Sequence, residues 1–203
     1  MTFVYAFCRA TSALTFKCVY RWKIAGRENL IEEGPAIYVA NHTSFFDPPI
    51  VGSVCRTELH YLARRSLLKT APMRWLLPRL NVHFIEKEAA DSSALRMALG
   101  LLKEGHRVVI FPEGTRSSDG ELQEPQAGVG WLAVKSQVRV VPVRIFGAFE
   151  VFSRHKKVPG LGKLGVHVGE SVVYSLDGKD ARQRYVEVAK DIMQKLADLP
   201  NPR

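Results

Sequence analysis

A histidine and an aspartate occur together in one short polar segment, Asn41-His42-Thr43-Ser44-Phe45-Phe46-Asp47. An imidazole titrates near neutral pH, so His42 could accept a proton and return it under cellular conditions. A general base of this kind needs a fixed tautomer, which a carboxylate bonded to its other ring nitrogen provides. A tight turn stopped by Pro48 could fold the carboxylate of Asp47 back onto the ring. The pair therefore predicts that His42 activates a hydroxyl group and that Asp47 orients His42.

The sequence offers no clear covalent nucleophile beside this pair. No serine occupies a GxSxG motif, and Cys8, Cys18 and Cys55 have no activating neighbours. We therefore expect direct attack by the substrate hydroxyl, without a covalent enzyme intermediate. The spacing alone is weak support, because the chain has 6 histidines and 20 acidic residues and such pairs arise by accident.

A second cluster of reactive residues is Phe111-Pro112-Glu113-Gly114-Thr115-Arg116-Ser117. Gly114 would allow a ligand to approach the backbone closely, and Thr115 could donate a hydrogen bond. Arg116 offers a planar fork suited to a phosphate group. Glu113 could hold that guanidinium in place or bind a substrate hydroxyl. A surface turn with a local Glu–Arg pair explains the same residues without any function, so both interpretations stay open here.

The two clusters follow apolar runs that are typical of buried strands, at residues 36–40 (AIYVA) and 107–111 (RVVIF). Ligand sites of open α/β sheets gather beyond the carboxyl ends of the strands. We therefore expect the two clusters to share one site. No metal is predicted there, because no paired histidine spacing accompanies His42, Asp47 and Glu113.

Strand-like and helix-like segments alternate along the rest of the chain, which predicts an α/β sheet covered on both faces. The expected strands lie at 21–25, 59–63 and 82–85, at 138–145, and once or twice within 164–173. The expected helices begin near Pro48 and at 66–77, with Pro72 as a possible break, and lie at 92–103, 129–135 and 179–196.

Composition narrows the class of protein further. The 203 residues carry a net charge of +9 with a pI near 9.6, which suits an anionic partner: nucleic acid, an acidic lipid surface, an acidic carrier protein or a phosphorylated substrate. Three cysteines without a CxxC pair argue against a disulfide framework and favour a reducing, cytoplasmic setting. The first twenty residues lack the features of a secretory signal.

Residues 1–20 are nevertheless expected to form an amphipathic helix. Phe3, Phe7 and Leu14 recur at spacings of four and seven, while Arg9 and Lys17 project from another side. Such a helix could lie in a lipid headgroup layer, or it could simply pack on the domain. We predict a membrane-associating helix at 1–20 and a catalytic domain at 21–203.

Taken together, these segments resemble the lysophosphatidic acid acyltransferase family of glycerolipid synthesis. Residues 41–47 match its NHxxxxD block, residues 111–117 match its FPEGTRS block, and Val141-Pro142-Val143 resembles a later Val-Pro block. The similarity extends over roughly residues 23–171. It implies a mixed, largely parallel α/β sheet with helices on both faces and a peripheral or monotopic position on the cytoplasmic face of the membrane.

The resemblance also implies roles and partners. His42 would be the base and Asp47 its orienting partner, with Glu113, Gly114 and Arg116 at the glycerol phosphate of a lysophospholipid acceptor. The acyl donor would be acyl-CoA or acyl-acyl carrier protein, with no cofactor. The product of lysophosphatidic acid acylation would be phosphatidic acid.

Two departures from the family pattern concern the acceptor. Phe84-Ile85-Glu86-Lys87 stands where the family usually has FIDR, so Lys87 keeps the charge but loses the bidentate fork of arginine. Pro125-Gln126-Ala127-Gly128 lacks a lysine that the family often has before the glycine. Another acceptor, such as a lyso-ornithine lipid or a different lysophospholipid, is therefore the nearest alternative.

A non-enzymatic module that binds anionic lipid or nucleic acid is the alternative from another class. The charge of +9 favours it, but it gives no reason for the two motifs to occur together, so we predict no nucleic-acid partner. The basic run Arg154-His155-Lys156-Lys157 could meet an acyl carrier or lipid headgroups. A solvated run of charges is the interpretation that we favour for it.

Overall fold

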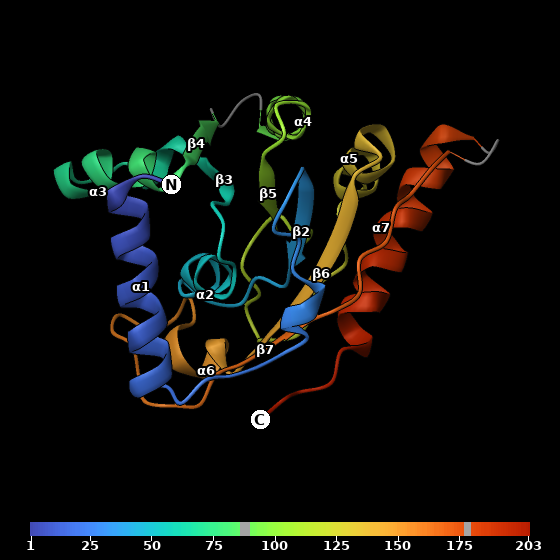
Figure 1. The fold of residues 1–203 in the computed structure, drawn as a ribbon. Coiled ribbons are helices and arrows are strands. Elements are labelled where there is room, and N and C mark those ends of the chain that lie inside the picture. Colours follow the sequence, from blue (N-terminus) through green and yellow to red (C-terminus); the bar gives the residue numbers. More distant parts are fainter. Residues whose placement is uncertain (86–89, 177–179) are drawn as a thin grey trace.

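A seven-stranded sheet organises the computed structural model, within the residues that it describes, 1–85, 90–176 and 180–203 (Figure 1). The strand order is β1-β7-β6-β2-β5-β3-β4. The strands are β1 (Lys23–Ala25), β2 (Ala36–Ala40), β3 (His60–Arg64), β4 (Val82–Ile85), β5 (Arg107–Ile110), β6 (Arg139–Phe146) and β7 (Gly165–Val168).

Strands β2 to β6 all run in one direction. Strand β2 is central, with Tyr38 level with Val109 of β5 on one side and with Val141 of β6 on the other. Strand β7 is antiparallel to β6, and β1 pairs with β7 in parallel, so these two strands at one side of the sheet run the opposite way. The expected mixed, largely parallel sheet is therefore confirmed.

Helices cover both faces of this sheet. Helices α1 (Phe3–Cys18), α2 (Asp47–Val54) and α6 (Ala148–Phe152) lie on one face, and α4 (Ala90–Lys103), α5 (Ala127–Ser136) and α7 (Ala181–Asp198) lie on the other (Figure 1). The remaining helical segments are α3 (Ala71–Leu76) and the short 3-10 turns η1 (Arg27–Asn29), η2 (Arg65–Leu67) and η3 (Leu77–Leu80).

The two layers explain why β2 is apolar at every position. Tyr38 packs in the core beneath α1 and α2, whereas Ile37 and Val39 pack in the core beneath α4, α5 and α7. All three side chains are completely buried. Burying an aliphatic side chain stabilises a fold by about 1.5–3 kcal/mol, so β2 anchors both cores and holds a fixed position for the loop that follows it.

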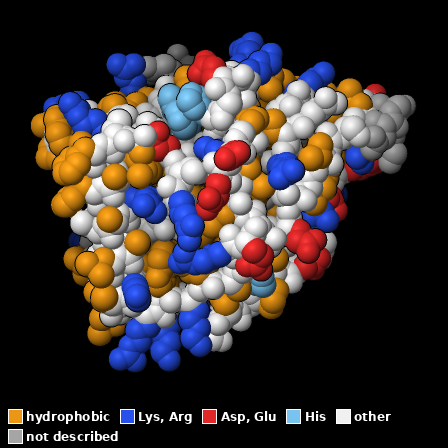
Figure 2. All heavy atoms as spheres, viewed as in Figure 1, with side chains coloured by type: hydrophobic (Ala, Val, Ile, Leu, Met, Phe, Trp, Pro, Cys, Tyr) orange, Lys and Arg blue, Asp and Glu red, His pale blue; other side chains and the backbone are white. Residues whose placement is uncertain are grey.

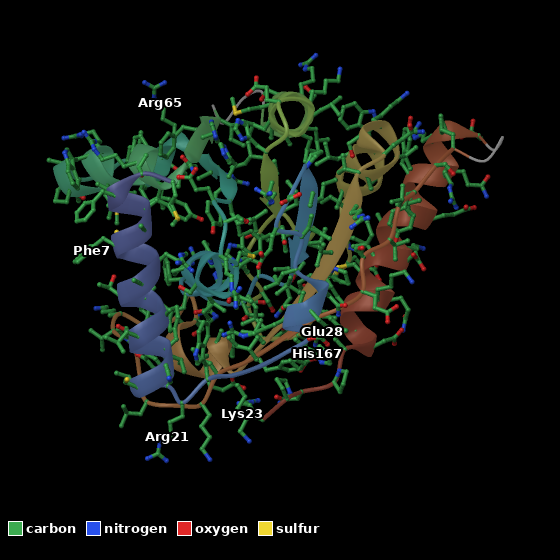
Figure 3. All side chains as sticks on the ribbon, in the orientation of Figure 1. Phe7, Arg21, Lys23, Glu28, Arg65 and His167 are labelled. Carbon is green, nitrogen blue, oxygen red and sulfur yellow. The ribbon has the colours of Figure 1, made fainter. Side chains whose placement is uncertain are left out.

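Helix α1 has one buried face and one exposed apolar face. The side chain of Thr2 caps its first turn by accepting a hydrogen bond from the backbone N–H of Tyr5. The Phe16 ring lies 5.5 Å from the Phe46 ring in a T-shaped arrangement, which joins α1 to the domain. Phe7, by contrast, is 59% exposed and points away from the body of the protein (Figure 3). No helix within the described ranges has the length and apolar character needed to span a bilayer.

The segment 66–77 differs from the sequence prediction, whereas 164–173 holds one strand, within the one or two expected there. Residues 66–77 are not one helix: η2, α3 and η3 replace it, and Pro72 lies in the first turn of α3 rather than at a break. Proline suits that position, because a first-turn residue needs no N–H donor. Within 164–173 only β7 is a strand, and Val172 forms an isolated bridge with Val140.

Candidate active site

His42 and Asp47 are in direct contact. Ring nitrogen Nδ1 of His42 lies 2.9 Å from Oδ2 of Asp47, so the contact expected from the spacing is present. A carboxylate oxygen accepts, which assigns the proton to Nδ1 and leaves Nε2 as the nitrogen with an available lone pair. The imidazole can therefore take a second proton only through Nε2.

The Asp47 carboxylate is completely buried where α2 begins. Its Oδ2 also accepts hydrogen bonds from the backbone N–H groups of Thr43 and Ser44, each at 2.7 Å. Burial raises the pKa of Asp47, and the bonds from His42, Ser44 and Thr43 oppose that rise. Its first-turn position suits a negative charge, and Pro48 follows where helices tolerate proline. The turn thus fixes the carboxylate with backbone groups before it meets the imidazole.

An aromatic side chain holds the other side of the imidazole. The rings of His42 and Phe111 are stacked, with centroids 4.1 Å apart and an angle of 22° between their planes. The His42 side chain is 19% exposed, so its ring is restrained but reachable from solvent. Phe111 directly follows β5 and belongs to the second cluster, so this stacking joins the second cluster to the first.

Backbone bonds join the two clusters into one site. The carboxylate of Glu113 accepts from the N–H of His42 at 2.8 Å and from the N–H of Gln123 at 3.3 Å. The N–H of Ser117 in turn donates to the carbonyl of His42 at 2.8 Å. Burial raises the pKa of Glu113 to about 7, against the lowering effect of these N–H donors. The prediction that the two clusters lie together, beyond the carboxyl ends of β2 and β5, is confirmed.

The guanidinium of Arg116 contacts an aromatic ring rather than the carboxylate of Glu113, the partner considered from the sequence. Its guanidinium carbon lies 3.6 Å from the centre of the Phe45 ring, a cation–π contact. Across the described residues no ion pair joins it to Glu113, whose carboxylate is bound to backbone N–H groups instead. Of the two roles that the sequence left open for Glu113, the structure therefore does not support the one in which it holds the guanidinium. Nη1 of Arg116 is buried and has no hydrogen-bond partner among the residues that the structure describes.

A third loop, which the sequence analysis did not place at the site, completes its wall. Ser44 and Ser153 form an isolated antiparallel bridge, and the Ser44 hydroxyl donates to the carbonyl of Phe152 at 2.8 Å. Arg154 donates to the carbonyl of Arg116 at 3.3 Å. The basic run 154–157 thus begins in contact with the second cluster. No local pattern reveals this, since the Ser44–Phe152 bond joins residues 108 apart.

Asn41 ties the first cluster to β6. Its side-chain amide donates to the carbonyl of Ile145 at 3.0 Å, and its carbonyl accepts from the N–H of Ile145 at 2.7 Å. This two-way bond continues the pairing of β2 with β6 beyond the end of β2. Asn41 therefore fixes the direction of the backbone that leads from β2 to His42.

The other predicted residues differ in how closely they join the site. Gly114 lies on the exposed part of the turn with φ of +70°, and Thr115 is exposed beside it. Lys87 lies outside the described residues.

Two surface hollows of about 320 and 390 Å³ are lined by other parts of the chain, near His60 and near Trp22, and not by His42. No trio of His, Cys, Asp or Glu within 1–85, 90–176 and 180–203 is placed to hold a metal ion.

The substitution Gly114→Ala is expected to disturb both the turn and the site. A left-handed backbone costs a residue with a Cβ roughly 1–2 kcal/mol, and the new methyl carbon would lie 2.3 Å from the Gln126 side-chain amide. Gly34→Ala is a matched control, because Gly34 has φ of +73° and open space around its Cβ position. Thermal unfolding should show a similar loss of stability for both variants. Only Gly114→Ala should lower turnover, and equal turnover in both would contradict a role for this turn in the site.

Comparisons with known proteins identify the family of the chain. A family model described as Acyltransferase matches residues 21–146, which contain both clusters. The chain is 32% identical over 148 residues to the human 1-acyl-sn-glycerol-3-phosphate acyltransferase beta, covering 70% of this chain and 53% of the human protein. It is 22% identical over 200 residues to the 1-acyl-sn-glycerol-3-phosphate acyltransferase of Bacillus subtilis (strain 168), covering 98% of each. The chain spans about half the length of the human relative.

The fold has a solved counterpart as well. The crystal structure of the 1-acyl-sn-glycerophosphate (LPA) acyltransferase from Thermotoga maritima matches with a TM-score of 0.76 and 26% identity, over 96% of this chain and 79% of that one. The chain therefore belongs to the acyltransferase family. Within that family, the relatives given above are lysophosphatidic acid acyltransferases.

Proposed function

We propose that this protein transfers a fatty acyl group from acyl-CoA or acyl-acyl carrier protein to the sn-2 hydroxyl of lysophosphatidic acid, forming phosphatidic acid. The observation that carries the proposal is the hydrogen-bonded pair of His42 and Asp47, joined by backbone bonds to the Glu113–Arg116 turn. A base and a phosphate-binding fork in one site match an acceptor that has a hydroxyl and a phosphate.

The chemical step follows from the assigned tautomer. Nε2 of His42 takes the proton of the acceptor hydroxyl as its oxygen attacks the thioester carbonyl. The tetrahedral intermediate then collapses, the carbon–sulfur bond breaks, and the imidazolium returns the proton to the departing thiolate. The Asp47 carboxylate stabilises the imidazolium between these steps, and Phe111 keeps the ring in position. Backbone amides would stabilise the oxyanion of the intermediate.

Acceptor binding is assigned to the second cluster and to one further cation. Arg116 would bind the phosphate through its fork, aided by Lys87. Glu113 would orient the turn through its bonds to His42 and Gln123, and Gly114 and Thr115 would line the approach to the glycerol. The stacking of Arg116 on Phe45 supports this role, because it restrains the fork before the ligand arrives.

An acyltransferase with a different acceptor is the second candidate, and one residue favours it. The side chain of Gln126 packs against Gly114, so an uncharged amide stands at the turn where the family often has a lysine nearby. Purified protein should be supplied with labelled acyl-CoA and a panel of lysophosphatidic acid, lyso-ornithine lipid and other lysophospholipids. The proposal expects the highest kcat/KM with lysophosphatidic acid. No turnover of it beside rapid turnover of another acceptor would replace the first candidate with the second.

We also propose peripheral attachment to the cytoplasmic face of the membrane through α1. Hydrophobic side chains gather over α1 and α3 along the left edge of Figure 2, with Lys and Arg side chains among them. On α1, Phe3, Phe7 and Leu14 are 84%, 59% and 63% exposed and lie on one side of the helix. Arg21 and Lys23 project just beyond its C-terminal end (Figure 3). An apolar stripe edged by cations suits an anionic lipid surface.

Phe7→Glu is expected to weaken binding to anionic phospholipid vesicles by roughly tenfold or more, because it removes an apolar group worth about 2 kcal/mol or more and adds a repelled charge. Vesicle sedimentation measures the change. Val186→Glu is the matched control, since Val186 is 40% exposed on α7, across the sheet from α1. Equal binding by both variants would show that α1 is not the attachment surface.

A further inference from the structure

Two arginines meet at the edge of the candidate site. Arg154 belongs to the loop after α6, and its Nη1 donates to the backbone carbonyl of Arg116. Burial lowers the pKa of Arg116, and the neighbouring charge of Arg154 lowers that pKa further. Arg154 thus lies close enough to Arg116 to destabilise the charge of that guanidinium.

Within the described part of the chain, no carboxylate is in direct contact with this pair of arginines. Among the residues that the structure describes, neither Arg116 nor Arg154 forms an ion pair with a carboxylate. Asp47 acts on Arg116 only as a more distant charge, because its own oxygen is bound to His42, Thr43 and Ser44. Adjacent like charges cost free energy, and a phosphate dianion beside both guanidinium groups would remove that cost.

The surroundings keep both arginines in place. The Phe45 ring supports the guanidinium of Arg116, and the Ser44–Ser153 bridge fixes the residue before Arg154. The ring of His155, the residue after Arg154, bonds to the carbonyl of Ser118 at 2.9 Å. Both cations are therefore carried by loops that are bound to each other and to the first cluster. Groups fixed in this way lose less entropy when they bind a ligand.

We infer that Arg154 is a second arginine of the acceptor's phosphate site, paired with Arg116, and that it makes the enzyme prefer acceptors with a phosphate monoester. This inference rests on the proposed function. Within the basic run 154–157, Arg154 contacts the site, whereas Lys157, three residues on, is exposed and forms no hydrogen bond or ion pair with any residue that the structure describes.

The test compares Arg154→Gln, Arg154→Lys and the control Lys157→Ala, which removes one positive charge from the same loop. KM and kcat are measured with lysophosphatidic acid and with the monoacylglycerol of the same acyl chain, which lacks the phosphate. Arg154→Gln should raise KM for lysophosphatidic acid about tenfold, as expected for loss of a charge-assisted hydrogen bond. Its KM for monoacylglycerol should not change. Arg154→Lys should be intermediate, and Lys157→Ala should match the wild type.

Two results would overturn the inference. One is an unchanged KM for lysophosphatidic acid in Arg154→Gln. The other is an equal loss of activity with both acceptors, because a residue that merely supports the backbone of Arg116 would affect them alike. Thermal unfolding of each variant shows whether the fold is retained.

A binding measurement separates this inference from the proposed function. Calorimetric titration of the protein with glycerol 3-phosphate, without acyl donor, requires no turnover. If the wild type fails to acylate lysophosphatidic acid but binds glycerol 3-phosphate, and Arg154→Gln weakens that binding about tenfold, the proposed function fails and the inference stands. If the wild type acylates lysophosphatidic acid and Arg154→Gln has the same KM, the function stands and the inference fails.

Discussion

His42→Ala should reduce acyl transfer to lysophosphatidic acid by roughly a thousandfold or more, at the upper part of the range for a lost general base. The expected loss is in kcat, because Nε2 of His42 is the group that takes the acceptor's proton in the proposed step. Acceptor binding should persist, since the Arg116 fork contacts Phe45 and not the imidazole. The measurement is the steady-state rate with labelled acyl-CoA, accompanied by the affinity for glycerol 3-phosphate.

A second histidine variant controls for the loss of an imidazole. His106 stacks on His60 beside the beginning of β5, at the end of the sheet opposite to the candidate site. His106→Ala should therefore keep nearly all of the activity. A His42→Ala protein that folds normally and retains more than about a tenth of the wild-type rate would remove His42 from the role of base.

Asp47→Asn should preserve the turn but lower kcat by roughly a hundredfold to ten-thousandfold, the scale known for the orienting aspartate of serine proteases. The amide oxygen can take the place of Oδ2 and accept from Thr43 and Ser44. The uncharged amide, however, no longer stabilises the imidazolium. Its NH₂ would occupy the position of Oδ1, which is buried and has no partner in the described part of the chain, at a cost of about 1–3 kcal/mol in the free energy of unfolding.

Asp47→Ala distinguishes the two contributions. It removes the acceptor of three hydrogen bonds and leaves buried N–H groups of Thr43 and Ser44 unpaired, so its loss of stability should exceed that of Asp47→Asn. Its kcat should be no higher than that of the amide variant. Chemical denaturation and steady-state kinetics measure the two effects separately. Asp47→Asn with unaltered kcat would show that the carboxylate supports only the fold.

Local patterns in the sequence predicted the elements that carry the site. Residues 36–40 are predicted as a strand with the bounds that β2 has, because a continuous apolar run of that length suits a strand buried on both faces. The contact of Asp47 with His42 followed from the spacing and from Pro48. These features depend on residues that are neighbours in the chain.

Contacts between distant segments could not be predicted in the same way. Helix α6 has only five residues, too few for a helical period to stand out, and the loop after it reaches the first cluster across more than a hundred residues. The charge of Glu113 suggested Arg116 as its partner, but the fold brought backbone N–H groups of His42 and Gln123 closer. The roles of Phe45 and Phe111 likewise appear only when β2 and β5 are adjacent.

The central claim is that the imidazole of His42 activates the acceptor hydroxyl for direct attack on the thioester. Intact-protein mass spectrometry after mixing the enzyme with acyl-CoA tests this step, first without acceptor and then with lysophosphatidic acid. Direct attack by the acceptor hydroxyl predicts an unmodified protein in the first case and phosphatidic acid only in the second. A protein that gains one acyl group without acceptor, and passes it to lysophosphatidic acid on addition, would contradict direct attack.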